Sequence, residues 1–157
     1  MSLSIIMTLV LRYLLVMLFF PFSALDKTLN FAGAVRQAQE QVPVRAAASL
    51  LILIGLAVEI LMPLGILTGI ADRLAAFIMA GYCGVTALLW KQFWMPGDFW
   101  QRGQSRGRDL FWDFLKNFSL AGGFLLITFG TTAAGIGDFL AHPLLSSHPY
   151  ALHQGPP

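Results

Sequence analysis

The chain has 157 residues, of which 57% are hydrophobic and only 11% are charged, and its formal net charge is +2. Average soluble proteins carry about 25% charged residues, and a chain this short cannot bury so much apolar surface in water. The composition therefore predicts one membrane domain surrounded by a lipid bilayer, and it excludes a nucleic-acid-binding protein, which would carry a much larger positive charge.

Four segments are apolar over about 20 residues, the length that crosses a bilayer as a helix. They cover approximately residues 3–25, 46–70, 74–92 and 112–134. The first segment is not typical of a cleaved signal peptide, because no positive charge precedes its apolar core and Arg12 interrupts that core. We expect an all-α membrane protein, an antiparallel bundle of four transmembrane helices with a short amphipathic surface helix after the first span.

The surface helix is predicted within residues 28–44. Phe31, Val35, Ala38 and Val42 recur there at helical spacing among polar residues, and Pro43 ends the pattern. The second and third spans are then joined by a tight turn at residues 69–73, which makes these spans neighbours.

The third connection contains or borders all four tryptophans, as expected of an aromatic belt at the membrane surface: Trp90, Trp94, Trp100 and Trp112. We divide the chain into a membrane domain, residues 1–140, and an irregular tail, residues 141–157. The tail contains three histidines, His142, His148 and His153, whose spacings of six and five do not match metal ligands on one helix. We expect a disordered tail and no metal site.

Basic residues predict the orientation in the membrane. Loops one and three carry seven of them, against Arg73 alone on the other side. Because basic residues accumulate on the cytoplasmic side, we expect these loops in the cytoplasm, both termini outside it, and the protein in the cell (inner) membrane. The seven surface residues are Lys27, Arg36, Arg45, Lys91, Arg102, Arg106 and Arg108.

Two charges fall inside predicted spans. Arg12 and Glu59 lie near the centres of the first and second spans, displaced toward the same membrane face. An unpaired charge at mid-bilayer costs at least about 2.5–3.5 kcal/mol, so we predict an Arg12–Glu59 pair, the alternative being a protonated Glu59 that donates a hydrogen bond. Pro63 cannot donate to the Glu59 carbonyl and marks a helix discontinuity. Either a polar pocket lies here, or the pair only sets the packing of the two spans.

Lys116 is a third candidate for this pocket. By the predicted boundaries it lies about one turn inside the fourth span, where it can extend to the headgroups or pair with Asp113. The single cysteine, Cys83, lies in an apolar run and is expected to be a small buried hydrophobe. Gly65 and Gly69 form a GxxxG pattern that allows close helix packing, within the chain or between copies of it.

The order of these features resembles the DoxX family. The matching pieces are Arg12, Lys27, and the runs GLAVEILMPLGILTGIADR, FLKNFSLAGG and GIGDFL, which together cover about residues 8–140. One departure is the glycine usual near the end of the first span, where this chain has Pro21, Ser23 and Ala24. The resemblance implies a small four-helix membrane protein and a connection to quinone-coupled or oxidative-stress redox systems. It assigns no catalytic residues.

These observations favour a quinone-interacting or accessory subunit of a membrane redox system, in which Glu59 and Arg12 line a polar pocket. A small transporter that uses the same pocket and a scaffold that stabilises partner membrane proteins remain alternatives. No residue set for a haem or iron–sulfur cluster is found. Electrons would therefore be carried by a bound quinone or by redox partner proteins.

Overall fold

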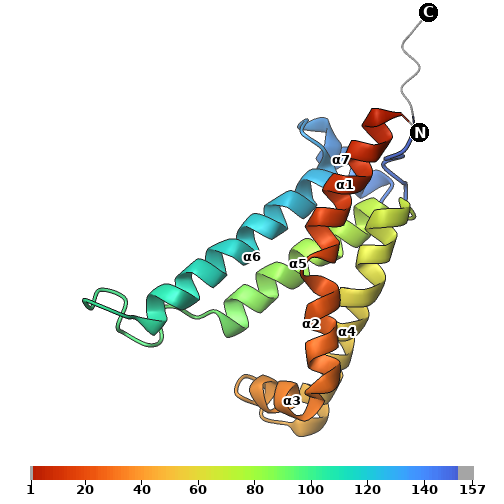
Figure 1. The fold of residues 1–157 in the computed structure, drawn as a ribbon. Helices are drawn as coiled ribbons and strands as arrows, with labels where there is room; N and C mark the ends of the chain where they lie inside the picture. Colours follow the sequence, from red (N-terminus) through yellow and green to blue (C-terminus); the bar gives the residue numbers. More distant parts are fainter. Residues whose placement is uncertain (1, 152–157) are drawn as a thin grey trace, which may run out of the picture.

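The computed structural model describes residues 2–151. Within that range the chain forms seven helices and no strand (Figure 1), and four helical segments are long and apolar enough to cross a membrane. The predicted all-helical membrane fold is confirmed. The helices are α1 (Leu3–Met17), α2 (Phe20–Leu29), α3 (Phe31–Gln39), α4 (Arg45–Thr68), α5 (Asp72–Trp90), α6 (Arg106–Phe129) and α7 (Ala134–Ala141).

The first span is built from two helices, α1 and α2, which together run from Leu3 to Leu29. Pro21 lacks a backbone N–H, so the carbonyl of Met17 has no helical donor, and α1 ends at that residue. The chain restarts as α2 with Pro21 in its first turn, where a proline is tolerated. The span therefore ends four residues later than the predicted boundary at 25.

The second span, α4, continues through Pro63 as one helix. Its buried residues recur every three or four positions and form one stripe that faces the bundle: Ala48, Ile52, Gly55, Glu59, Pro63 and Ile66. The helix ends at Thr68 and is capped by Gly69, whose φ of 78° is accessible to glycine at little cost. A methyl group on Gly65 would lie 3.1 Å from the Cβ of Ala75, so this glycine serves close packing within the chain.

The predicted surface helix is present as α3. Val35 and Ala38 pack against Ala48 and Ile52 of α4, and Trp90 at the end of α5 packs on the same cluster. Trp90 therefore packs within the chain, whereas Trp94, Trp100 and Trp112 are exposed, as residues of an aromatic belt would be.

The fourth span begins at Arg106 and ends at Phe129, about one and a half turns earlier than predicted. Its start is fixed by the connection before it. The carboxylate of Asp98 accepts hydrogen bonds from the backbone N–H groups of Arg106 and Gly107, and Ser105 caps Arg108. These donors lower the pKa of Asp98 below its usual range. The boundary was misplaced because a polar first turn does not stand out by hydropathy.

The prediction of a disordered tail is wrong for residues 142–151. After the unpredicted helix α7, this segment lacks helix but packs against the end of the bundle. The Tyr150 hydroxyl donates to the carbonyl of Leu67, and Pro149 lies against Gly69. His142 and His148 belong to this segment, while His153 lies outside the described residues; no group of residues suited to a metal ion occurs within 2–151.

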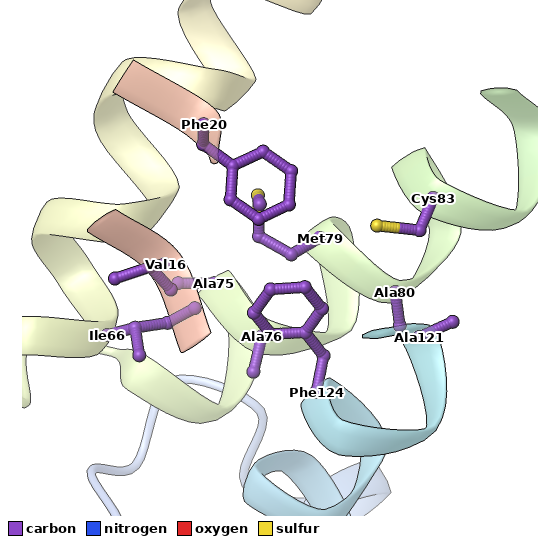
Figure 2. Close-up of a cluster of buried hydrophobic side chains, with 10 residues drawn as sticks. All are labelled: Val16, Phe20, Ile66, Ala75, Ala76, Met79, Ala80, Cys83, Ala121 and Phe124. Atoms are coloured by element: carbon purple, nitrogen blue, oxygen red, sulfur yellow. The ribbon is translucent and has the colours of Figure 1, made fainter. Parts of the chain in front are cut away.

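The core lies where the first span, α4, α5 and α6 meet (Figure 2). Phe20 and Phe124 bring the first and fourth spans together, with ring centroids 5.8 Å apart. Met79 and Cys83 of α5 fill the space beside them, both fully buried, which agrees with the expectation for Cys83.

Candidate functional site

A buried polar cluster lies around Glu59, and we call it the Glu59 site: Ser23, Lys27, Glu59 and Tyr82. Glu59 is only 1% exposed. Lys27 Nζ lies 2.7 Å from Oε1 and 2.9 Å from Oε2 of Glu59. The hydroxyls of Ser23 and Tyr82 donate to Oε1 at 2.9 and 2.8 Å. Three spans thus contribute to one site.

Helical spacing brings these side chains together. Ser23 and Lys27 are one turn apart on α2, and Lys27 also donates to the Ser23 hydroxyl at 2.7 Å. Glu59 belongs to the inward stripe of α4. Gly55, one turn before it, lies beside the Tyr82 ring, where a methyl group would make an ordinary contact of 3.6 Å with the Tyr82 hydroxyl.

The predicted Arg12–Glu59 pair is wrong, because the two side chains extend in opposite directions. Arg12 lies beside Ile66, and Lys27 lies beside Glu59, so advancing along the first span means moving back along α4. Side chains on a helix tilt toward its N-terminus. The Glu59 side chain therefore extends toward Lys27, while Arg12 extends toward the far end of the bundle.

Arg12 instead forms a second buried cluster with Asp72, the first residue of α5. Its guanidinium donates to Asp72 Oδ2 at 2.7 Å and to the Ile66 carbonyl at 2.6 Å. Ser147 completes the cluster: its hydroxyl accepts from Arg12 at 2.9 Å and donates to Asp72 at 2.5 Å. The backbone N–H of Ser147 also donates to Asp72 Oδ1. The segment after α7 therefore closes this end of the bundle.

Arg73, the residue after Asp72, forms its contacts with α6 and α7 and not with the first span. It donates to the carbonyl of Thr128 at 2.9 Å and to Asp138 of α7 at 2.6 Å, and its guanidinium lies over the Phe139 ring. Adjacent residues at the start of α5 thus join the first span, the fourth span and the C-terminal segment.

Lys116 lies apart from both buried clusters. Its side chain is 73% exposed, and its nearest carboxylate is Asp113 at 3.4 Å. Asp113 is bound more closely by Lys91 at 2.9 Å. Of the other basic surface residues, Arg36, Arg45, Arg102 and Arg106 are exposed, while Arg108 donates to the carbonyls of Phe99 and Gln101 and orders the third connection.

The hydrogen-bond donors of the Glu59 site surround a single carboxylate oxygen. The donors are Ser23, Tyr82 and Lys27, and the oxygen is Glu59 Oε1. Transfer of a proton from Lys27 to Glu59 would convert the ion pair into a neutral amine and acid, a form less penalised by burial. Within residues 2–151 every buried side-chain nitrogen and oxygen has a partner, so a ligand would have to replace one of these hydrogen bonds.

Sequence reasoning found Glu59 and Arg12, assigned Lys27 to the membrane surface although it pairs with Glu59, and missed Ser23, Tyr82, Asp72 and Ser147. Ser23 and Tyr82 were detectable, since Ser23 precedes Lys27 by one turn and Tyr82 is the one tyrosine of the third span. Asp72 was assigned to a turn, and Ser147 to a tail thought to be disordered, so no signal pointed to either.

Comparison with known proteins gives one family. The model described as DoxX matches residues 7–92, more than half of the chain. This range contains Arg12, Lys27, Glu59 and Tyr82. No curated protein and no solved structure matches the chain.

Proposed function

Because the chain belongs to the DoxX family of membrane proteins, we propose that it is an accessory subunit of a membrane redox system, in which the Glu59 site exchanges protons with a quinone headgroup. The observation that carries the proposal is the carboxylate of Glu59, 1% exposed inside a membrane bundle and paired with Lys27. Ionisable residues at such depth are costly and usually serve function.

The side chains of the site fit the two oxidation states of a quinone. Tyr82 and Lys27 are donors that a quinone carbonyl would accept, and Glu59 is an acceptor for a quinol hydroxyl. When Glu59 is protonated, its oxygen accepts hydrogen bonds less strongly, so Tyr82 and Lys27 become available to a ligand. The bound group would supply electron transfer, while the chain would supply the proton and the orientation.

The packing disfavours a permeation pathway. Between the Glu59 site and the Arg12–Asp72 cluster lie Val16, Phe20, Ile66, Met79 and Phe124, each no more than 1% exposed. A solute crossing the membrane through the bundle would have to displace this apolar layer. The scaffold alternative is tested by the experiment below.

Glu59→Gln separates the proposal from a scaffold. The variant keeps the size and much of the hydrogen bonding but has no ionisable group. We expect the host membrane's quinone-linked oxidation to fall about a hundredfold or more, the lower end of the effect expected for losing an acid–base group, while the protein and its partners remain at normal abundance.

Asp113→Asn is the matched control, because it makes the same chemical change in the half-exposed pair with Lys91. Oxidation should be normal in this control. Normal turnover in Glu59→Gln, or an equal loss in both variants, would contradict the proposal. Quinone that co-purifies with the wild type but not with Glu59→Gln would support it directly.

A further inference from the structure

We propose that Glu59 exchanges its proton with one side of the membrane only, the side of the third connection (residues 91–105), and that Lys27 is the route. This inference rests on the proposed function and adds the direction of proton movement. It follows from the position of Lys27 at one end of the Glu59 site, and from the apolar layer and the Arg12–Asp72 ion pair that close the opposite end of the bundle.

Lys27 is the exposed end of the Glu59 site. Its side chain is 23% exposed, whereas that of Glu59 is 1% exposed. The two residues after it, Thr28 and Leu29, complete α2, and the first span ends there. A proton from this side therefore reaches Glu59 in one transfer: the Lys27 ammonium gives a proton to the carboxylate, and the resulting amine takes one from the aqueous side.

Of the other titratable groups near Glu59, Tyr82 is partly exposed but lies about two turns before the end of α5 at Trp90, and Cys83 is buried. Tyr82 donates to the Glu59 carboxylate, and Cys83 is fully buried in the core (Figure 2). From α3, Arg36 and Glu40 are exposed and form no contact with Glu59. From α1, Arg12 is bound to Asp72. Among the described residues, Lys27 is thus the titratable group that contacts Glu59 and lies at the end of its span.

Two features block proton transfer to Glu59 from the opposite side of the membrane. A cluster of buried apolar side chains lies between the two polar clusters: Val16 and Phe20 in the first span, Ile66 in α4, Ala76 and Met79 in α5, and Phe124 of α6 (Figure 2). Beyond this layer, the Arg12–Asp72 pair is bound by Ser147. A proton from that side would have to leave a satisfied ion pair and then cross a dry layer without a carrier.

A carbodiimide tests the direction, because it modifies protonated carboxyl groups in apolar surroundings and crosses membranes itself. The full-length protein is reconstituted in vesicles, and protease access to the third connection reports the orientation of each population. The pH is then varied separately inside and outside. Mass spectrometry counts modified Glu59, as its carbodiimide adduct and as the amide that the activated carboxyl forms with Lys27.

We expect modification of Glu59 to follow the pH of the compartment facing the third connection. While the carboxyl is mainly ionised, modification should rise up to about tenfold for each unit by which that pH falls. It should not respond to the other compartment. Dependence on the opposite compartment, or on both equally, would overturn the proposal. So would the absence of modification at every pH, since the carboxyl would then hold no exchangeable proton.

Thiol accessibility gives an independent second measurement in a Cys83→Ala background. A membrane-impermeant maleimide should react with Lys27→Cys from the side of the third connection only, and with Val16→Cys from neither side. Reaction of Val16→Cys from the Ser147 side would show that the seal is open. These outcomes are independent of turnover in Glu59→Gln, so failure of the direction and failure of the redox role are distinguishable.

Discussion

Separating Arg12 from Asp72 should be among the most damaging changes to the stability of this protein. The Arg12 and Asp72 side chains are 9% and 0% exposed, and Asp72 accepts hydrogen bonds from Arg12 and from both polar groups of Ser147. Removing one partner of a buried pair costs about 3–5 kcal/mol, largely as the penalty on the charge left behind. We therefore expect Arg12→Ala and Asp72→Ala each to lower the free energy of unfolding by that amount.

The double variant decides whether this reasoning is right. Because neither single variant has a partner for the remaining charge, removing both should cost less than the sum, with a coupling of about 0.5–3 kcal/mol. The assay is reversible denaturant unfolding in detergent micelles. The matched cycle pairs Arg12→Ala with Glu59→Ala, which make no direct contact and should be additive to within about 0.5 kcal/mol. Additive losses for Arg12→Ala and Asp72→Ala, or strong coupling between Arg12→Ala and Glu59→Ala, would refute the assignment of Asp72 as the partner of Arg12.

Three further predictions concern the ends of the bundle. Ser147→Ala removes hydrogen bonds to two charged groups and should lower the free energy of unfolding by about 1–3 kcal/mol, measured in the same micelles; no change would mean that the C-terminal segment does not close the bundle. The pKa of Asp98 is lowered, so Asp98 stabilises the fold above the ordinary pKa of 3.8, and this stabilisation is lost as the pH falls through the folded-state pKa. The thermal unfolding temperature of Asp98→Asn should therefore differ from that of the wild type at neutral pH and converge with it in acid. A difference that stays constant with pH would contradict this. Lys116→Ala should change stability by less than about 0.5 kcal/mol, because its ion pair is long and exposed; a larger loss would place Lys116 in a buried contact.

The sequence was sufficient for the spans because apolar runs of membrane length are a strong signal. It also located the surface helix, since Val35 and Ala38 repeat at helical spacing. Boundaries were less accurate where polar residues continue a helix. Lys27 lies inside α2, and Arg106 opens α6, because local hydrogen bonding and not hydropathy decides where these helices end.

Two of the buried charges, Arg12 and Glu59, were identified from the sequence, but their partners were not. Depth in the membrane follows from counting residues, and by that measure Arg12 and Glu59 were neighbours. Contact depends also on the direction of each side chain, which is opposite in the two helices. The role of Asp72 required the position of Ser147, 75 residues away in the chain, and this proximity arises from tertiary packing.

The central claim is that Lys27 and Glu59 are in contact inside the membrane, and zero-length coupling tests it most directly. A carbodiimide activates a carboxyl group, and an amide with lysine forms only if the amine already touches it. Mass spectrometry of the reconstituted wild-type protein should detect a Lys27–Glu59 linkage, lost in Lys27→Arg, whose guanidinium does not couple under these conditions. A Glu59 linkage to Lys116 or Lys91 in place of Lys27 would contradict the account.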